Sequence, residues 1–117
     1  MANSKDLKDR TKQFAVTVIR MVDKLPRSVA SEVIARQIIR SATSVAANYR
    51  AARRGRSKAE FIAKLQIVLE ESDETQYWLE LLLELELLDR KALQDSIQEA
   101  DELTAIFVSA LKTAKSK

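Results

Sequence analysis

Apolar residues return along this chain every three or four positions, in four segments that polar breaks separate. The spacing starts with Leu7, Phe14 and Val18 and is repeated in the three later segments, where Ile38, Leu79 and Phe107 are among the expected core positions. Residues three and four apart share one face of an α-helix, whereas a half-buried strand requires strict alternation. The pattern therefore predicts four amphipathic helices, over about residues 5–24, 29–54, 58–88 and 91–114.

The breaks between the segments carry turn and capping residues. Pro26 ends the first segment, and Ser28 is a suitable cap for the second helix. Gly55 is the only glycine in the chain, and it lies where the second helix could end in a left-handed cap. Ser57 and Glu60 have the spacing of a capping box, which predicts the start of the third helix.

The short connections favour packing between helices that are neighbours in sequence. The predicted fold is therefore all-α, an antiparallel up-down-up-down four-helix bundle. One glycine and one proline leave little material for β-hairpin turns, and 46% apolar residues suffice for a core. The whole chain, residues 1–117, is expected to form one domain.

Charge is distributed unevenly along the chain, although the net charge is only +3. Residues 27–58 contain eight basic residues and one acidic residue. Residues 59–89 contain one basic residue and nine acidic residues. A basic helix is thus followed directly by an acidic one, which indicates an electrostatic role for the surface of at least one of them.

The basic residues of the second helix form an outward stripe that ends at the Gly55 corner. Arginine donates in a rigid fork that suits phosphate oxygens, so the stripe is a candidate site for the backbone of RNA or DNA. A second interpretation is that these arginines pair with Glu70, Glu71 or Glu74, or with carboxylates of a neighbouring subunit. The candidate nucleic-acid-binding residues are Arg36, Arg40, Arg50, Arg53, Arg54, Arg56 and Lys58.

The inner side of the second helix is unusually small and polar. This composition predicts close approach of two helices and a buried hydrogen-bond network that fixes their register; a pocket built on Asn48 is the alternative. Ser72, Thr75 and Gln76 of the third helix are the expected partners. The predicted network consists of Gln37, Ser41, Ser44 and Asn48.

The third helix carries apolar residues on a second side, around the stretch "YWLELLLELELL". Because one side is already needed for the core, the second predicts a subunit interface of a homo-oligomer; an apolar surface without a partner is the alternative. Glu80 and Glu84 interrupt the stripe and argue against a membrane surface. The predicted interface residues are Ile67, Tyr77, Trp78, Leu81, Leu85 and Leu88.

Several kinds of chemistry are excluded by composition. The chain has no cysteine and no histidine, so thiolate sites, Ser-His-Asp sets and the Glu-x-x-His pairs of di-metal bundles are impossible. No Gly-rich phosphate loop is present. We expect no enzyme activity, no metal and no cofactor. No apolar run approaches the roughly 18 residues of a membrane span, so we expect a cytoplasmic protein without membrane contact.

The sequence over roughly residues 7–114 resembles the 23S rRNA intervening-sequence protein family of four-helix bundles. The resemblance rests on "LPRS", on "RQIIRSATSVAANYRAARRGRSKAEFIAKL" (Arg36 to Leu65), on "EESDETQYWLELL" and on "EADELTAIF". It implies assembly into rings, commonly pentamers. A related branch serves as accessory protein to reverse transcriptases of diversity-generating retroelements, where a basic ring surface engages nucleic acid and the enzyme.

One stretch departs from the family. Many relatives have Asn-Ile-Ala-Glu-Gly where this chain has Asn48-Tyr49-Arg50-Ala51-Ala52, which removes an acid and adds an arginine. The expected function is that of a non-catalytic, ring-forming bundle whose basic surface binds RNA or DNA. The alternative is a scaffold oligomer whose arginines pair with acidic residues of neighbouring subunits or of a protein partner such as a reverse transcriptase.

Overall fold

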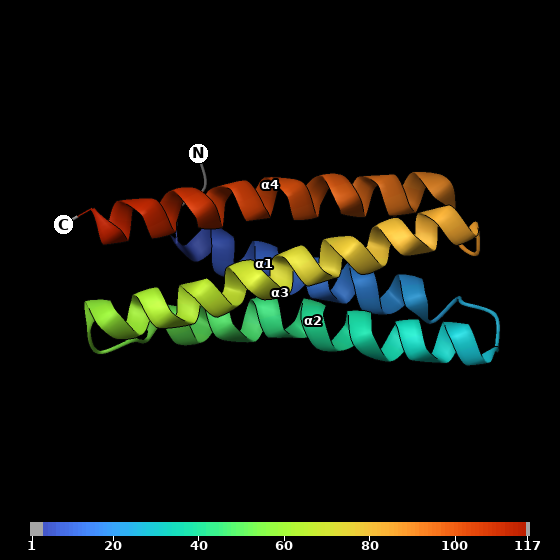
Figure 1. Ribbon diagram of the computed structural model, residues 1–117, viewed down its shortest axis with the longest axis horizontal. Helices are drawn as coiled ribbons and strands as arrows, with labels where there is room; N and C mark the ends of the chain where they lie inside the picture. The colour runs from blue at the N-terminus through green and yellow to red at the C-terminus, as the bar shows by residue number, and fades with distance from the viewer. Residues whose placement is uncertain (1–3, 117) are drawn as a thin grey trace.

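Four helices make up the computed structural model, which describes residues 4–116 and the side chains of residues 7–116. Successive helices run in alternating directions along one long axis (Figure 1). The expected all-α four-helix bundle is thereby confirmed. The helices are α1 (Ser4–Val22), α2 (Val29–Arg53), α3 (Lys58–Leu85) and α4 (Arg90–Lys115).

The core lies along the bundle axis and is formed by the apolar face of each helix. Ile38, Leu79 and Phe107, all at predicted core positions, are fully buried. Packing is most extensive between α2 and α3 and between α3 and α4, and least extensive between α1 and α4. α1 is the shortest helix, and α3 and α4 extend beyond its N-terminal end (Figure 1).

An ion-pair cluster bridges the sparse contact between α1 and α4. The guanidinium of Arg10 holds both carboxylate oxygens of Glu99 at 2.8 Å and one oxygen of Glu102 at the same distance. The hydrogen bonds to Glu99 are the main reason that the pKa of Arg10 is raised above its usual value. These long-range partners have no local sequence pattern, and sequence reasoning missed them.

The small polar residues of α2 and α3 form two pairs between helices. Thr75 of α3 donates to Ser41 of α2 over 2.8 Å, at the predicted place. Ser72, expected to face α2, instead shares a 2.7 Å hydrogen bond with Thr104 of α4. Each pair joins two helices that are neighbours in the bundle, and such small side chains allow the backbones of packed helices to approach.

The remaining predicted network residues lie on the partly buried edge of α2. The amide nitrogen of Asn48 donates to the carbonyl and the hydroxyl oxygen of Ser44, one turn earlier in the same helix, over 3.0 and 2.8 Å. Gln37 is half-buried. The amide of Asn48 is therefore satisfied within its own helix.

Two helix ends differ from expectation. The prediction of a left-handed cap at Gly55 is wrong, because the backbone of Gly55 does not have a positive φ. The left-handed residue is Glu86, at φ 56° and ψ 37°, and it ends α3 three residues before the predicted boundary. Apolar content continues through Leu87 and Leu88, so the periodicity alone could not locate this turn.

Candidate nucleic-acid interface

The corner between α2 and α3 is a tight turn that is closed by backbone hydrogen bonds. The N–H groups of Arg54 and Gly55 donate to the carbonyls of Ala51 and Ala52, each over 3.1 Å. A Cβ atom on Gly55 would lie 3.2 Å from the Ala52 carbonyl oxygen, closer than usual contacts. The close approach of backbone therefore favours glycine here, since a side chain would have to push the Ala52 carbonyl aside by a few tenths of an ångström.

The start of α3 is capped as the sequence predicts, with one change of partner. Ser57 accepts from the N–H of Glu60 over 3.1 Å. The carboxylate of Glu60 reaches back to the N–H of Arg56, one residue before the cap, over 2.8 Å. An acidic group thus occupies the positive end of the helix, so anion binding at this corner depends on arginine side chains.

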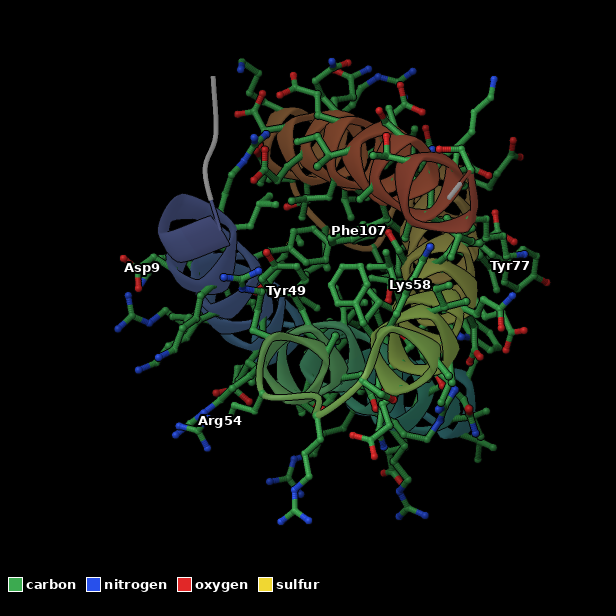
Figure 2. The ribbon with its side chains drawn as sticks, turned by 90° about the vertical axis from the view of Figure 1, so that its left-hand side faces the viewer. Asp9, Tyr49, Arg54, Lys58, Tyr77 and Phe107 are labelled. Atoms are coloured by element: carbon green, nitrogen blue, oxygen red, sulfur yellow. The ribbon has the colours of Figure 1, made fainter. Side chains whose placement is uncertain are left out.

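Four arginines project from this end of the bundle into solvent. Arg50 and Arg53 lie in the last turn of α2, Arg54 follows them, and Arg56 lies in the turn; all are exposed. Figure 2 shows Arg54 at the edge of the molecule, across the corner from Lys58. Their fixed charge and multiple donors suit several phosphate groups of one backbone.

A buried aromatic pair anchors the end of α2 that carries these arginines. Tyr49 is 4% exposed, and its ring centroid lies 6.0 Å from that of Phe107 in α4. Burial raises the pKa of the Tyr49 hydroxyl, while the charge of Arg53 acts in the opposite direction. Because its ring is in the core, Tyr49 offers no stacking surface to a nucleic-acid base.

Arg40 has a different environment from the arginines at the corner. Its guanidinium binds Glu71 at 3.2 Å and also Glu74, both on α3. The hydrogen bond to Glu74 is the leading cause of the raised pKa of Arg40. Arg36 is exposed on the same stripe but lies fourteen residues from Arg50, about 20 Å along a helix. The seven candidate residues therefore do not form one site.

Two lysines of α1 lie close to the basic stripe and were missed by sequence reasoning. Lys8 and Lys12 line a groove of about 540 Å³ between α1 and α2, together with Asp9 and Arg50. Both lysines are exposed. Their spacing of four residues places them on one face of α1, but only the packing of α1 on α2 brings them to Arg50.

The six predicted interface residues of α3 differ in how far they are exposed to solvent. Ile67, Tyr77 and Leu85 are exposed to 37%, 55% and 44%. Trp78 is half-buried, and its indole N–H donates to Glu74 over 3.0 Å. The other two, Leu81 and Leu88, pack partly against the core. Sequence reasoning missed three further exposed apolar residues, Val29, Val33 and Val108.

Two absences are established for the part of the chain that the structure describes. Within residues 4–116, no helix combines the length and apolar character needed to span a bilayer. The described side chains, those of residues 7–116, contain no cluster of three or more acidic, histidine or cysteine residues arranged to hold a metal ion.

Comparison with known proteins supplies a family and a fold. The family model described as "23S rRNA-intervening sequence protein" matches residues 4–109. A solved structure from Bacteroides thetaiotaomicron, described as a protein of unknown function from the S23 ribosomal protein family, is 37% identical with a TM-score of 0.83. The match covers 91% of this chain and 98% of that one. None of the curated proteins matches the chain.

Proposed function

Because the chain belongs to the 23S rRNA-intervening sequence protein family, we propose that it is a non-catalytic, ring-forming bundle that binds the phosphate backbone of RNA or DNA. The ring would be a pentamer, by resemblance to relatives, and would act in the cytoplasm. The observation that carries the proposal is the group of exposed arginines at the α2–α3 corner. The ion pairs among the described residues involve Arg10, Arg40 and Lys91, not these corner arginines.

The chemistry of this corner favours contact with phosphates over contact with bases. Each guanidinium offers a planar fork of donors, and the nearby aromatic ring of Tyr49 is buried. Binding would therefore show little sequence preference and a strong dependence on salt. A ring would repeat the corner in every subunit, and such multivalency raises affinity without new contacts.

The test is a variant that removes three positive charges from the corner. Arg53, Arg54 and Arg56 are replaced by glutamine, and binding to a short mixed-sequence RNA and to its DNA counterpart is measured at several salt concentrations. We expect weaker binding and a smaller slope of log affinity against log salt, by about 2 for three lost contacts to a single strand.

A matched control removes three exposed arginines from the opposite end of the bundle. Arg20, Arg27 and Arg90 are replaced by glutamine, which changes the net charge by the same amount. We expect this control to have nearly the same affinity for RNA and DNA, and the same slope of log affinity against log salt, as the unmodified protein. Equal effects of the two triple variants, or no effect of either, would contradict a phosphate site at the corner.

A second function is favoured by the behaviour of Arg40. That residue already binds two carboxylates, which supports the alternative of a scaffold whose arginines pair with acidic groups of a neighbouring subunit or a protein partner, such as a reverse transcriptase. In that case the corner triple variant would change the oligomer mass or the stability of the assembly. Nucleic-acid affinity would then be low in every variant.

A further inference from the structure

The groove between α1 and α2 has an apolar floor and a basic rim. Small and aliphatic side chains line its floor, among them Ala15, Val16 and Ala47. Lys8 and Lys12 of α1 line one side, and Arg50 of α2 lines the other. Small residues permit close approach of another helix. An apolar floor has no hydrogen-bond donors or positive charges with which to bind a phosphate backbone. The groove is therefore suited to an amphipathic helix with acidic flanks.

The outer side of α3 has the complementary composition. Tyr77, Leu81 and Leu85 follow one another at intervals of four residues, so they form a continuous apolar stripe over two helical turns. Tyr77 and Leu85 are about half exposed. Glu80 and Glu84 lie beside the stripe and are exposed. This surface is an acidic, amphipathic helical face without a covering partner among the described residues.

The two surfaces lie on different sides of the bundle. Figure 2 shows Asp9, which lines the groove, on the opposite side of the molecule from Tyr77. The groove of one copy and the stripe of the next can therefore be used at the same time. A contact between two different surfaces is heterologous, and repeated contacts of this kind generate rings when the rotation closes.

We propose that the α1–α2 groove of one copy seats the Tyr77–Leu81–Leu85 stripe of a second copy. Apolar contact would bury the stripe on the alanine-rich floor, and the basic rim would face the carboxylates of Glu80 and Glu84. The proposal rests on the ring assembly proposed above and identifies its interface. It assigns the groove, with Arg50, to a protein neighbour and leaves Arg53, Arg54 and Arg56 of the corner available for nucleic acid.

A test of complementary variants separates a heterologous contact from a symmetric one. Ala47→Trp fills the exposed part of the groove, and Tyr77→Ser with Leu85→Ser removes the exposed part of the stripe. Light scattering of each purified full chain is expected to give the monomer mass, 13.2 kDa. An equal mixture is expected to give twice that mass, because each chain retains one intact surface. All measurements are made without nucleic acid.

Several outcomes would overturn the proposal. If the unmodified chain is an oligomer and either variant keeps its full mass, the groove and the stripe do not form the interface. If both variants are monomers with helical circular dichroism but their mixture stays monomeric, the two surfaces do not bind each other. A monomeric unmodified chain would instead contradict the ring assembly itself. Val108→Ser, at an exposed apolar site on α4, is the control and is expected to retain the full mass.

Discussion

Thr75 of α3 donates its hydroxyl hydrogen to Ser41 of α2 over 2.8 Å, and both side chains are fully buried. Ser41 in turn donates to the carbonyl of Ile38 over 3.2 Å. The Thr75 hydroxyl also lies 2.7 Å from the carbonyl oxygen of Glu71, so each hydroxyl has a partner within its own helix as well. A sliding movement of one helix would separate the two hydroxyls and lose the hydrogen bond that joins the helices. The pair therefore specifies the register of α2 on α3.

Thr75→Val should destabilise the bundle although it preserves shape. It removes the donor to the Ser41 oxygen, and because Ser41 still donates to the Ile38 carbonyl, we expect a loss of about 1 kcal/mol in the free energy of unfolding. Adding Ser41→Ala should cost less than the sum of the single changes, because the hydrogen bond between the two hydroxyls is lost only once. Urea unfolding measures these values. Strict additivity would show that the two hydroxyls act independently. Thr43→Val, at an exposed position of α2, is the control.

Glu86→Gly should stabilise the protein. Glu86 is the one non-glycine residue with positive φ in the described chain, and the left-handed conformation costs an ordinary residue about 1 kcal/mol. Glycine adopts it without that cost and is the usual residue after a helix. We expect a gain of about 0.5–1 kcal/mol in thermal or urea unfolding. Glu70→Gly, at an exposed position in the middle of α3, should instead lose about 1 kcal/mol. A loss in both variants would argue against the left-handed turn.

The periodicity of apolar residues located the helices well, because burial of one face of each helix imposes that periodicity. Ile38, Leu79 and Phe107 lie on the predicted stripes and are fully buried. The ends of the helices were harder to predict, since they depend on backbone geometry as well as on the pattern of apolar residues. The left-handed turn occurs at Glu86 and not at Gly55, and no preference of glutamate for that conformation could have indicated it.

The candidate site was only partly predictable from sequence, because the role of each arginine depends on whether a carboxylate of the next helix or solvent faces its guanidinium. Arg40 and Arg54 belong to the same outward stripe in the sequence. In the structure Arg40 faces Glu71 and Glu74, and Arg54 faces solvent at the corner. The lysines of α1 reach the same region through packing between helices. The sequence offered Glu71 and Glu74 as partners for the arginines, and Arg40 confirms that interpretation, but the sequence did not indicate which arginine would pair.

Glu74 should contribute to the acid sensitivity of the fold. The hydrogen bond from Arg40, and then that from the Trp78 indole, lower the pKa of Glu74. A lowered folded-state pKa gives stability that is fully present above the ordinary carboxyl pKa, about 4.3, and is lost as pH falls through the lower folded value. Glu74→Gln should therefore reduce the loss of stability between neutral pH and about pH 3.

The measurement is the urea midpoint of each variant at several pH values. Glu70→Gln, at an exposed position of the same helix outside the proposed interface, serves as the control. If Glu74→Gln and Glu70→Gln give the same pH profile, the Arg40–Glu74 contact has no role in acid sensitivity.

Arg10→Lys should loosen α1 from α4. Lysine keeps the positive charge, but its ammonium group has a single nitrogen. It cannot bind both carboxylate oxygens of Glu99 in a bidentate pair and also bind Glu102. Because these groups are partly exposed, we expect a loss of about 1 kcal/mol. Native-state hydrogen exchange should accelerate in α1 more than in α2 or α3, since α1 has few other contacts with α4.

The control for that experiment is Lys91→Ala. Lys91 pairs with Asp95 within α4 and is 77% exposed, so its removal should change stability very little. Uniform acceleration of exchange across all four helices in Arg10→Lys would mean that the cluster stabilises the whole bundle and not the attachment of α1.

Single substitutions at Arg40 and Arg54 should separate a structural arginine from a binding one. Arg40→Gln leaves Glu71 and Glu74 without their cation, so we expect lower stability in urea and nearly unchanged affinity for RNA. Arg54→Gln removes an exposed corner charge, so we expect unchanged stability and weaker binding, with a salt slope smaller by about 0.7 for a single strand. Loss of RNA affinity in Arg40→Gln alone would place the binding surface on the α2–α3 seam, because Arg40 of α2 lies there against Glu71 and Glu74 of α3.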